Sequence, residues 1–320
     1  MASPNLITAP LNQTFKRIGL VGKPAHTQTS AGLAALAGVV AWLCQNGECQ
    51  IETHTAVSLA SFGISHNTHI ITDLREMPAQ VDALIVVGGD GTMLAVARGL
   101  AGSNMPLIGI NQGQLGFMTD ISLQDFSTDL NTVLQGGYTL ESRSMIQGEL
   151  IRNRQTIAHA LALNDAVIAR GNYASMVDVC VHIDQKLTYH LRADALVLAT
   201  PTGSTAYALS SNGPIMHPAV PGFVLVPVAP QTLSNRPIVL PDHSVIDVLL
   251  EPTSRGIGAT ASFDMQQWPA LQVHDIVRLS KSPLKTILVH PLSYDYYHTL
   301  RHKLHWTYNP IVPHLQATTI

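Results

Sequence analysis

The first part of the chain alternates apolar runs of strand length with longer segments of helical periodicity. Residues 83–87 form an unbroken apolar run, Ala-Leu-Ile-Val-Val, which is typical of a strand buried on both faces. Residues 31–45 follow Thr29 and Ser30, which are both good helix caps. We expect an α/β domain with strands at 17–22, 49–53, 81–87 and 105–111 and helices at 31–45 and after Thr92.

From about Ser144 the pattern changes to short apolar runs with turn residues between them, which is typical of an antiparallel, β-rich domain. The expected strands are 146–152, 160–169, 176–183, 195–199, 244–250 and 275–279, and helical character returns at 300–306. We therefore predict an α/β domain at 1–143, a β-rich domain at 144–290, and a C-terminal segment at 291–320 that packs back on the first domain.

Composition narrows the class of protein. A length of 320 residues, 46% of them hydrophobic and 12% charged, allows two domains with substantial cores. The net charge of −3 and the lack of a Lys/Arg run give no general attraction to nucleic acid. The apolar stretch 31–44 is too short to span a bilayer, and residues 1–14 lack the pattern of a secretory signal. We expect a cytoplasmic enzyme with neither a nucleic-acid nor a membrane partner.

A glycine turn with a carboxylate, Gly88-Gly89-Asp90-Gly91-Thr92, follows the apolar run 83–87. Its exposed N–H groups and the N-terminus of the helix that follows are expected to bind phosphate. Asp90 would repel phosphate unless it takes a proton or acts through a divalent cation, so the combination indicates phosphoryl transfer. The alternative is a hairpin turn at Asp90-Gly91, which the helical periodicity of residues 93–100 disfavours.

The cysteines and histidines give no clear metal site. Cys44, Cys49 and Cys180 form no C-x-x-C pair, which argues against a disulfide framework and a structural zinc site. The side chains of His298, His302 and His305 would share one helix face, but acidic ligands and a second cluster are missing. We therefore favour a polar helix face, which could be an interface, and predict no metal ligands from the protein.

A second polar loop, Thr200-Pro-Thr-Gly-Ser-Thr-Ala-Tyr, follows the apolar run 195–199. Its hydroxyls and amides suit a polyhydroxylated, phosphorylated ligand, although ordinary surface loops share this composition. Asn164-Asp165 lies inside an apolar strand pattern at 161–168, where burial would be costly without partners that a ligand can supply. Asp194, close to Arg192, is either a further specificity group or part of a surface ion pair.

Together these segments resemble the successive motifs of NAD kinases, in the order and spacing of the bacterial form. The motifs are Gly88-Gly89-Asp90-Gly91, the segment 109–119, Asn164-Asp165, Arg192-Ala-Asp194, the segment 200–210 and Leu233-Ser-Asn-Arg-Pro237. Diacylglycerol, sphingosine and phosphofructo-kinases share the G-G-D-G turn, whereas the T-P-T-G-S-T-A-Y loop is much more specific. The resemblance covers residues 17–306.

The resemblance implies a Rossmann-like three-layer α/β domain followed by an all-β, sandwich-like domain, with NAD in the cleft between them. ATP would supply the phosphate with a divalent cation, Mg²⁺, and Asp90 would be the general base that takes the proton of the ribose 2′-hydroxyl. Gly88, Gly89, Gly91 and Thr92 would bind the ATP phosphates, and the chain would form a homodimer or homotetramer. The residues implied at the NAD site are Asp90, Gly91, Asn164, Asp165, Ser175, Arg192, Asp194, Thr205, Ala206, Tyr207, Ala208, Leu209, Ser210 and Gln266.

Three positions depart from the family pattern. Asp165 stands where the family usually has Glu, so its carboxylate is one methylene shorter. Asn212 replaces a glycine, and it is one of the better non-glycine residues for a positive φ, so we expect the turn to survive. Asp264-Met265-Gln266 replaces a typical Asp-Gly-Gln, so Met265 stands at the glycine, which puts the local turn geometry in question.

Two other functions stay open at this point. The first is a lipid or sugar kinase that uses the same glycine turn, which the identity of the phosphorylated acceptor would reveal. The second is a dinucleotide sensor that binds without turnover. A P-loop ATPase and a Rossmann dehydrogenase lose their main support, because the sequence contains neither G-x-x-x-x-G-K-[ST] nor G-x-G-x-x-G.

Overall fold

The chain divides into two compact units, neither of which is a continuous segment. The computed structural model describes residues 14–23, 29–46, 48–61, 69–71, 73–113, 116–171, 176–252 and 259–306. Among these, the α/β unit comprises 14–93, 105–140 and 288–306, and the β-rich unit comprises 94–104 and 141–287.

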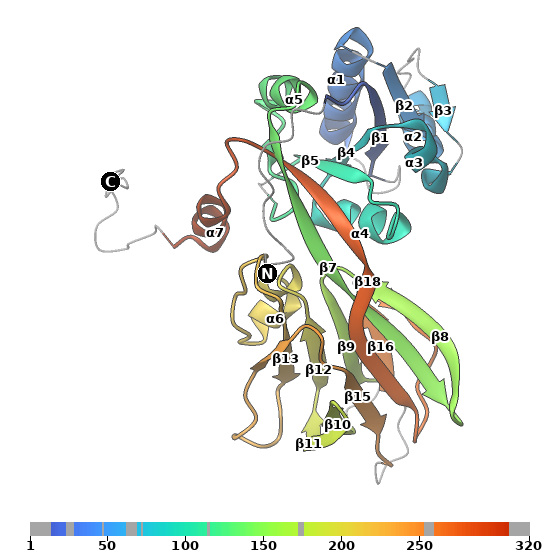
Figure 1. Cartoon of the computed structure of the whole chain (residues 1–320), viewed down its shortest axis with the longest axis vertical. Helices are drawn as coiled ribbons and strands as arrows, with labels where there is room; N and C mark the ends of the chain where they lie inside the picture. Colours follow the sequence, from blue (N-terminus) through green and yellow to red (C-terminus); the bar gives the residue numbers. More distant parts are fainter. Residues whose placement is uncertain are drawn as a thin grey trace. The chain divides into compact units, whose positions relative to one another are not determined.

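A parallel sheet forms the centre of the α/β unit, with strands in the order β3-β2-β1-β4-β5-β6 (Figure 1). The strands are β1 (Arg17–Gly22), β2 (Glu48–Glu52), β3 (His69–Ile71), β4 (Ala83–Gly88), β5 (Pro106–Asn111) and β6 (Ile121–Ser122). The helical segments are α1 (Ser30–Asn46), α2 (Thr53–Ser61), η2 (Leu74–Glu76), α3 (Met77–Gln80), the start of α4 (Asp90–Gly99), α5 (Phe126–Leu134) and α7 (Tyr296–Leu304). The strand order reverses between β1 and β4, and in such sheets ligands bind beyond the carboxyl ends of the strands at this switch point.

Local sequence explains most of these elements. All six residues of β4 are buried, as its continuous apolar run predicts. Thr29 caps α1 by accepting a hydrogen bond from the Gly32 N–H at 3.1 Å. The apolar face of α1 contributes Leu36, Val39, Val40 and Leu43 to the core of this unit, together with residues of β1, β4 and β5.

Two antiparallel sheets form the β-rich unit. One contains β11, β10, β15 and β18 in that order, with β7 and β8 beside β18, and the other has the order β14-β13-β12-β9-β16-β17. The strands are β7 (Tyr138–Arg152), β8 (Gln155–Ala162), β9 (Asp165–Arg170), β10 (Val177–Ile183), β11 (Lys186–Ala193), β12 (Ala195–Ala199), β13 (Gly222–Val228), β14 (Ile238–Pro241), β15 (Ile246–Leu250), β16 (Ala259–Phe263), β17 (Gln266–Gln267) and β18 (Ile276–Pro291). Two short helices, η3 (Gly203–Thr205) and α6 (Tyr207–Ser210), follow β12.

A single apolar cluster joins the two sheets of the β-rich unit. Val179, Val248 and Leu279 enter it from one sheet, and Leu196 and Phe223 enter it from the other. The sandwich-like fold predicted for this part is therefore confirmed. The cluster also explains one glycine of β7, because a Cβ on Gly148 would lie 2.1 Å from the ring of Phe263.

Several expected elements differ from the structure. The strand expected at 146–152 begins earlier, at Tyr138, and the strand expected at 275–279 continues to Pro291. The single strand predicted at 160–169 is wrong: β8 ends at Ala162 and β9 begins at Asp165. The interruption arises because the carboxylate of Asp264, about a hundred positions away, accepts the backbone N–H groups of Leu163, Asn164 and Asp165. The helix expected at 300–306 begins earlier, at Tyr296, where Asp295 caps it by accepting the Tyr297 N–H at 2.8 Å.

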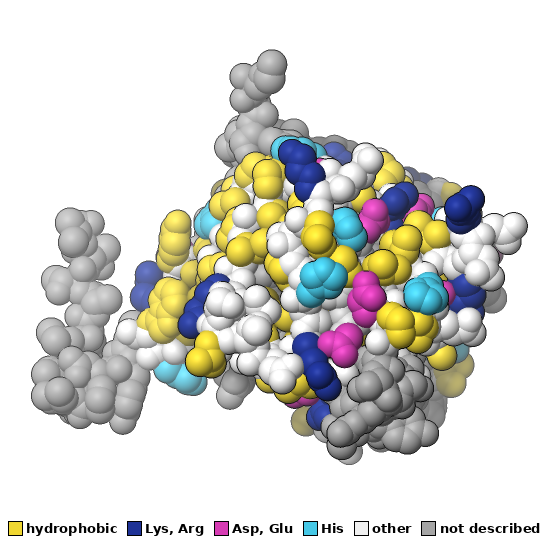
Figure 2. Space-filling model, turned by 90° about the horizontal axis from the view of Figure 1, so that it is seen from below, with side chains coloured by type: hydrophobic (Ala, Val, Ile, Leu, Met, Phe, Trp, Pro, Cys, Tyr) yellow, Lys and Arg dark blue, Asp and Glu magenta, His cyan; other side chains and the backbone are white. Residues whose placement is uncertain are grey.

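The surface is electrically mixed on the face that Figure 2 shows, where basic, acidic and histidine side chains are scattered among apolar and uncharged ones. Such a mixture gives no concentrated attraction to polyanions on this face. Among the described residues, the structure contains no helix long and apolar enough to cross a membrane.

Candidate active site

The glycine turn lies at the carboxyl end of β4, beside the switch point of the parallel sheet. Gly88 is the last residue of β4, and α4 begins two residues later at Asp90. A Cβ on Gly88 would lie 2.5 Å from the Thr92 hydroxyl oxygen, so the tight exit from the strand requires glycine here. Cβ atoms on Gly89 or Gly91 would meet nothing within 4 Å. The turn therefore presents open backbone at a helix N-terminus, which is a typical anion-binding arrangement.

The carboxylate of Asp90 is held by three donors of one neighbouring loop. Its Oδ2 accepts the Phe117 N–H at 3.0 Å, and its Oδ1 accepts the Met118 N–H at 3.1 Å and the Thr119 hydroxyl at 3.3 Å. A carboxylate offers about four lone-pair sites, so this orientation leaves capacity for one further partner. Asp90 is thus a fixed acceptor at the first residue of α4.

A short polar network orders the loop that holds Asp90. Asn111, at the end of β5, donates from Nδ2 to the Thr119 hydroxyl at 2.8 Å and accepts the Gly113 N–H at 2.6 Å. Gly116 packs directly on the carboxylate, because a Cβ there would lie 2.3 Å from Asp90 Oδ1. Sequence reasoning did not single out Gly116, although it lies inside the motif 109–119.

A buried His–Asp pair follows directly after this loop. His290 Nδ1 lies 2.9 Å from Asp120 Oδ2, both side chains are almost fully buried, and the ring of Tyr294 stacks on His290 at 4.0 Å. The pair anchors the side chain of Asp120, which directly follows Thr119 in the chain. No sequence pattern indicated it, because the two residues are far apart along the chain.

A cavity of about 740 Å³ in the β-rich unit brings together several predicted residues. Asn164 and Asp165 line it from the start of β9, and Ala206 and Tyr207 line it from the loop after β12. The other lining residues are Leu94, Val167, Thr260, Ala261, Ser262, Asp264, Met265, Gln267, Trp268 and Ala270. The cavity therefore combines amide, carboxylate and phenol groups with apolar and aromatic walls, as small-molecule sites do.

Asp264 organises the polar wall of this cavity. Its side chain is fully buried and accepts the three N–H groups of residues 163–165, and Arg98 of α4 donates to it at 2.9 Å. Asp264 and Met265 form the two-residue turn between β16 and β17, with φ of 45° and 64°. These angles are those of the hairpin turn that glycine and asparagine prefer, so the turn persists with methionine in a left-handed conformation.

Two groups on the wall are poised for a ligand. Burial, followed by the nearby charge of Asp264, raises the pKa of Asp165 to about 7. The buried Oδ1 of Asn164 has no hydrogen-bond donor within the described part of the chain. A buried acceptor without a donor is costly, and a bound molecule can supply the donor.

The hydroxyls of the loop at 200–205 hold its own backbone. Thr200 donates to the Leu163 carbonyl and accepts the Gly203 N–H, and Ser204 accepts the Met216 N–H at 2.9 Å. Thr202 accepts a hydrogen bond at 3.0 Å from buried Arg143, which is also paired with Glu141. These hydroxyls therefore shape the loop through bonds to the protein itself.

The same loop packs tightly on the Asn164 turn. A Cβ on Gly203 would lie 2.0 Å from the Asn164 carbonyl oxygen, so only glycine allows this approach. Further along, Asn212 has a φ of 64°, which confirms that asparagine sustains the left-handed turn there.

The remaining predicted residues are spread more widely. Thr205, Ala208, Leu209 and Ser210 belong to η3 and α6 beside the cavity, and Gln266 begins β17, but they do not line the cavity. Arg192 lies 3.8 Å from Asp178, and Asp194 lies 3.4 Å from Arg170 in an exposed ion pair. Ser175 lies outside the described residues.

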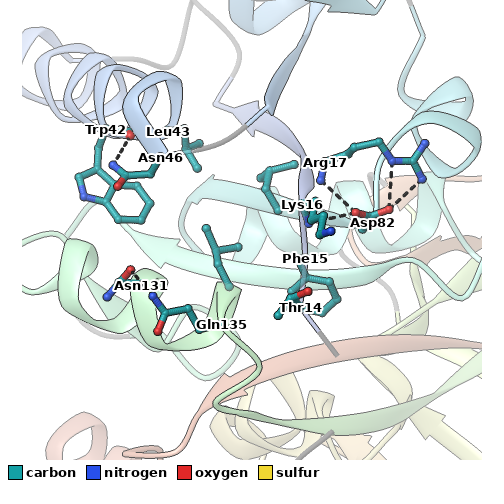
Figure 3. Close-up of a pocket in the computed structure, with 12 residues that line it drawn as sticks. Thr14, Phe15, Lys16, Arg17, Trp42, Leu43, Asn46, Asp82, Asn131 and Gln135 are labelled. Carbon is teal, nitrogen blue, oxygen red and sulfur yellow. Dashed lines mark hydrogen bonds and ion pairs between the residues drawn. The ribbon is translucent and has the colours of Figure 1, made fainter. Parts of the chain in front are cut away.

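Another cavity, of about 760 Å³, lies in the α/β unit (Figure 3). Phe15, Trp42 and Leu43 form its apolar wall, and Arg17 donates two hydrogen bonds to Asp82 at its edge. None of the residues predicted from the sequence lines this cavity.

Two family models match most of the chain. The model described as the ATP-NAD kinase N-terminal domain matches residues 19–138, and the model described as the ATP-NAD kinase C-terminal domain matches residues 163–291. The first match contains the glycine turn and the second contains the cavity wall.

Curated relatives and solved structures agree with these matches. The chain is 45% identical over 298 residues to an NAD kinase of Bordetella parapertussis (92% of this chain, 97% of the relative) and 42% identical over 300 residues to one of Burkholderia thailandensis (94% and 97%). A yeast NADH kinase complexed with NADH superposes with a TM-score of 0.83 at 21% identity, covering 96% of this chain and 93% of that one. An Archaeoglobus fulgidus NAD kinase in complex with ATP gives a TM-score of 0.65 at 23% identity, covering 90% and 98%.

Proposed function

The chain belongs to the NAD kinase family, and from this premise we propose how its own residues transfer the γ-phosphate of ATP to the 2′-hydroxyl of the adenosine ribose of NAD. The reaction gives NADP and ADP. The observation that carries the assignment of roles is the carboxylate of Asp90, held by three donors at the first residue of α4.

Asp90 is the general base. Its remaining acceptor site takes the proton of the 2′-hydroxyl while the oxygen attacks the γ-phosphorus. The bond between that oxygen and phosphorus forms, the bond to the bridging β–γ oxygen breaks, and ADP leaves with the electron pair. The fixed orientation matters because a base must lie within hydrogen-bond reach of the proton it removes.

The phosphates of ATP bind at the glycine turn. Gly89 and Gly91 leave open space there, and the N-terminus of α4 favours negative charge. The divalent cation enters as part of the substrate, Mg²⁺ bound to the ATP phosphates, which is how Mg²⁺ commonly reaches kinase sites. It lowers the repulsion between Asp90 and the phosphates. Gly88 and Thr92 shape the turn.

NAD uses the polar wall of the cavity in the β-rich unit. The unpaired Asn164 Oδ1 accepts a hydrogen bond from an exocyclic amine or a hydroxyl of NAD, and Asp165 binds a second polar group of NAD. Tyr207 offers a ring for a flat base. The other residues proposed for NAD are Asp90, Gly91, Ser175, Arg192, Asp194, Thr205, Ala206, Ala208, Leu209, Ser210 and Gln266. The enzyme is further proposed to act in the cytoplasm as a homodimer or homotetramer.

The experiment incubates purified protein with ATP, Mg²⁺ and NAD and detects NADP with an NADP-specific dehydrogenase. We expect Asp90→Asn to lower turnover by about 10²- to 10⁴-fold while NAD binding, measured by calorimetry, is retained. The Asp129→Asn variant, which changes a carboxylate on α5, controls for the loss of any acidic side chain.

The effects on kcat and on KM separate the base from a merely structural role. Loss of the base should lower kcat and leave the KM for NAD close to that of the wild type. Turnover at the wild-type rate by Asp90→Asn would refute the role of Asp90 as general base. Binding of NAD without NADP formation by the wild type would instead indicate a sensor, and phosphorylation of another acceptor would indicate a different kinase.

A further inference from the structure

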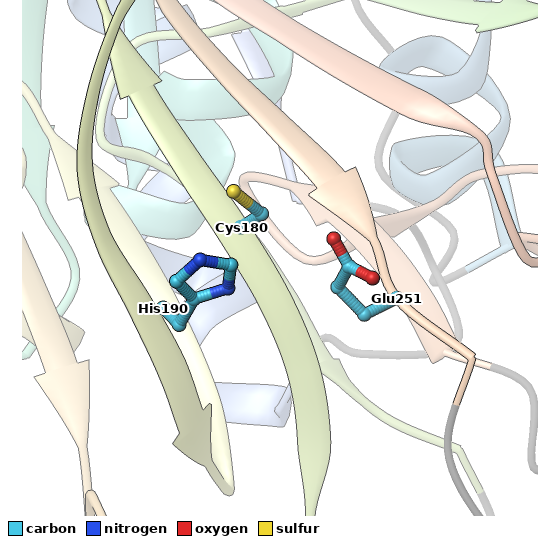
Figure 4. A group of neighbouring side chains, drawn as sticks. All are labelled: Cys180, His190 and Glu251. Atoms are coloured by element: carbon cyan, nitrogen blue, oxygen red, sulfur yellow. The ribbon is translucent and has the colours of Figure 1, made fainter.

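One group of three potential metal ligands occurs in the described part of the chain, and none of its members lines the cavity of the candidate active site. Cys180, His190 and Glu251 each offer one ligand atom, and these atoms all lie within 4.8 Å of one another. Figure 4 shows their side chains projecting together from neighbouring segments of one sheet. Three histidines with helical spacing, His298, His302 and His305, do not form such a group in the described part of the chain.

The strand register creates this cluster. Cys180 of β10 pairs directly with His190 of β11, and β15 pairs with β10 on its other side. Glu251 follows the last residue of β15 and continues the ladder, because its N–H donates to the Asp178 carbonyl at 3.1 Å. Side chains directly or diagonally opposite across adjacent strands are close enough to share a partner.

The three side chains share the sheet face that points away from the core. Their strand neighbours Val179, Leu191 and Leu250 belong to the apolar cluster of the β-rich unit, and successive residues of a strand point to opposite faces. Cys180 is nonetheless buried, Glu251 is half-buried and His190 is exposed. The cluster is therefore partly enclosed and open to solvent on the side of His190.

We propose that Cys180, His190 and Glu251 bind one zinc ion on this sheet face. Thiolate, imidazole and carboxylate are the three ligand types of protein zinc sites, and a set of three leaves the fourth tetrahedral position for water.

The distances suit this ion. Zinc bonds of about 2.0 to 2.3 Å at tetrahedral angles place ligand atoms about 3.4 to 3.6 Å apart. The observed limit of 4.8 Å exceeds this by roughly 1 Å, which side-chain rotation can close without moving paired strands. His182 Nδ1 lies 4.0 Å from the Cys180 sulfur but does not belong to the three-residue group.

The surrounding charges favour a cation. Without one, an ionised thiol and the Glu251 carboxylate would repel each other at this separation. The Nε of Arg192, which lies on the same strand as His190, is 3.8 Å from Asp178 Oδ1. The exposed side of His190 gives the ion a route of entry.

The test uses the full-length chain with any affinity tag removed, stripped of metal with a chelator and titrated with Co²⁺ and then Zn²⁺. We expect one equivalent of Co²⁺ to give a cobalt–thiolate charge-transfer band, and Zn²⁺ to displace it. The Cys180→Ser variant should lose the band. His190→Gln should bind zinc more than about 100-fold more weakly, because even second-shell partners change zinc affinity by about 10- to 100-fold.

Cys44→Ser is the matched control, since Cys44 is exposed and outside the cluster. It should retain both the band and the stoichiometry. His190→Gln changes an exposed residue, so it tests the site even if Cys180→Ser fails to fold. The absence of a thiolate band in the wild type, its persistence in Cys180→Ser, or wild-type zinc affinity in His190→Gln would overturn the proposal. None of these readouts depends on NADP formation.

Discussion

At the scale of single residues, burial of the Asp165 carboxyl group, which is proposed to bind NAD, lowers the stability of the folded protein as the pH rises. Burial and the charge of Asp264 raise the pKa of Asp165 from 3.8 to about 7 in the folded protein. The unfolded chain therefore releases this proton near pH 4, and the folded protein keeps it until about pH 7. Because the pKa of Asp165 is raised on folding, its contribution to the free energy of unfolding is most favourable below pH 4 and is lost as the pH rises to about 7.

Asp165→Asn should remove this loss. The variant is expected to gain roughly 2 to 4 kcal/mol of unfolding free energy relative to the wild type between pH 4 and pH 8. Paired thermal or urea unfolding of both proteins across this range measures the difference, and Asp125→Asn, at an exposed position, provides the reference for losing a carboxylate. A difference that stays constant with pH would show that Asp165 is ionised in the folded state.

Gly116 offers a second test at this scale, because its missing side chain makes room for Asp90. A Cβ there would lie 2.3 Å from Asp90 Oδ1 and 2.2 Å from the Thr119 hydroxyl oxygen. Gly116→Ala should therefore displace Asp90, the proposed base, and lower turnover by about 10²-fold, the usual effect of a 1 Å misplacement. Gly113→Ala is the control, since its Cβ would meet only Asn111 Oδ1, at an ordinary 3.7 Å. Equal activities of the two variants would argue against the packing role.

At the scale of elements, the hairpin between β16 and β17 contains a strained residue. Met265 is 89% exposed and has a φ of 64°, so its side chain gains little from burial while its backbone is left-handed. A left-handed residue other than glycine costs about 1 to 2 kcal/mol, and glycine loses about 0.5 to 1 kcal/mol through chain entropy. Met265→Gly should therefore raise the unfolding free energy by about 0.5 to 1 kcal/mol in urea titrations.

Met265→Ala separates the two contributions to that change. It removes the exposed side chain but keeps the Cβ, so we expect no gain in stability. If alanine stabilises the protein as much as glycine does, the side chain rather than the backbone causes the strain.

Elements with strong local signals could be predicted from the sequence, and those set by distant contacts could not. The buried run at 83–87 and the strand at 195–199 were predicted because their apolar residues alone determine them. The break at Asn164 depends on the carboxylate of Asp264, which no local window contains. The inward hydroxyls of Thr200 and Ser204 likewise depend on Leu163 and Met216.

The candidate site follows the same division. Its glycine turn and Asp90 could be recognised in the sequence, because a carboxylate stands inside a turn that is expected to bind phosphate. The loop that orients Asp90, the His290–Asp120 pair and the ion pair of Arg98 with Asp264 became visible only in three dimensions. A single sequence therefore reveals the residues proposed to react more readily than the residues that position them.

At the scale of the whole molecule, the path of the chain matters because the β-rich unit includes residues 94–104 as well as 141–287. Arg98 of α4 supplies the partner of the fully buried Asp264, and Arg143 bonds to Thr202. Removing one partner of a buried pair costs about 3 to 5 kcal/mol, a large part of the 5 to 15 kcal/mol that stabilises a typical domain. The predicted domain at 144–290 lacks both arginines.

We therefore expect the fragment 144–290, expressed alone, to show no cooperative unfolding transition. A fusion of residues 94–104 to 141–287 through a flexible linker restores both arginines and should regain a transition, which calorimetry or urea titration followed by circular dichroism measures. The same fusion with Arg98→Met controls for the added length, and it should be less stable than the fusion with Arg98. The opposite outcome is a fragment 144–290 that unfolds cooperatively by itself and is as stable as the fusion. It would show that the boundary at 143 separates two independent domains, and that the second domain does not need the helix that begins at Asp90.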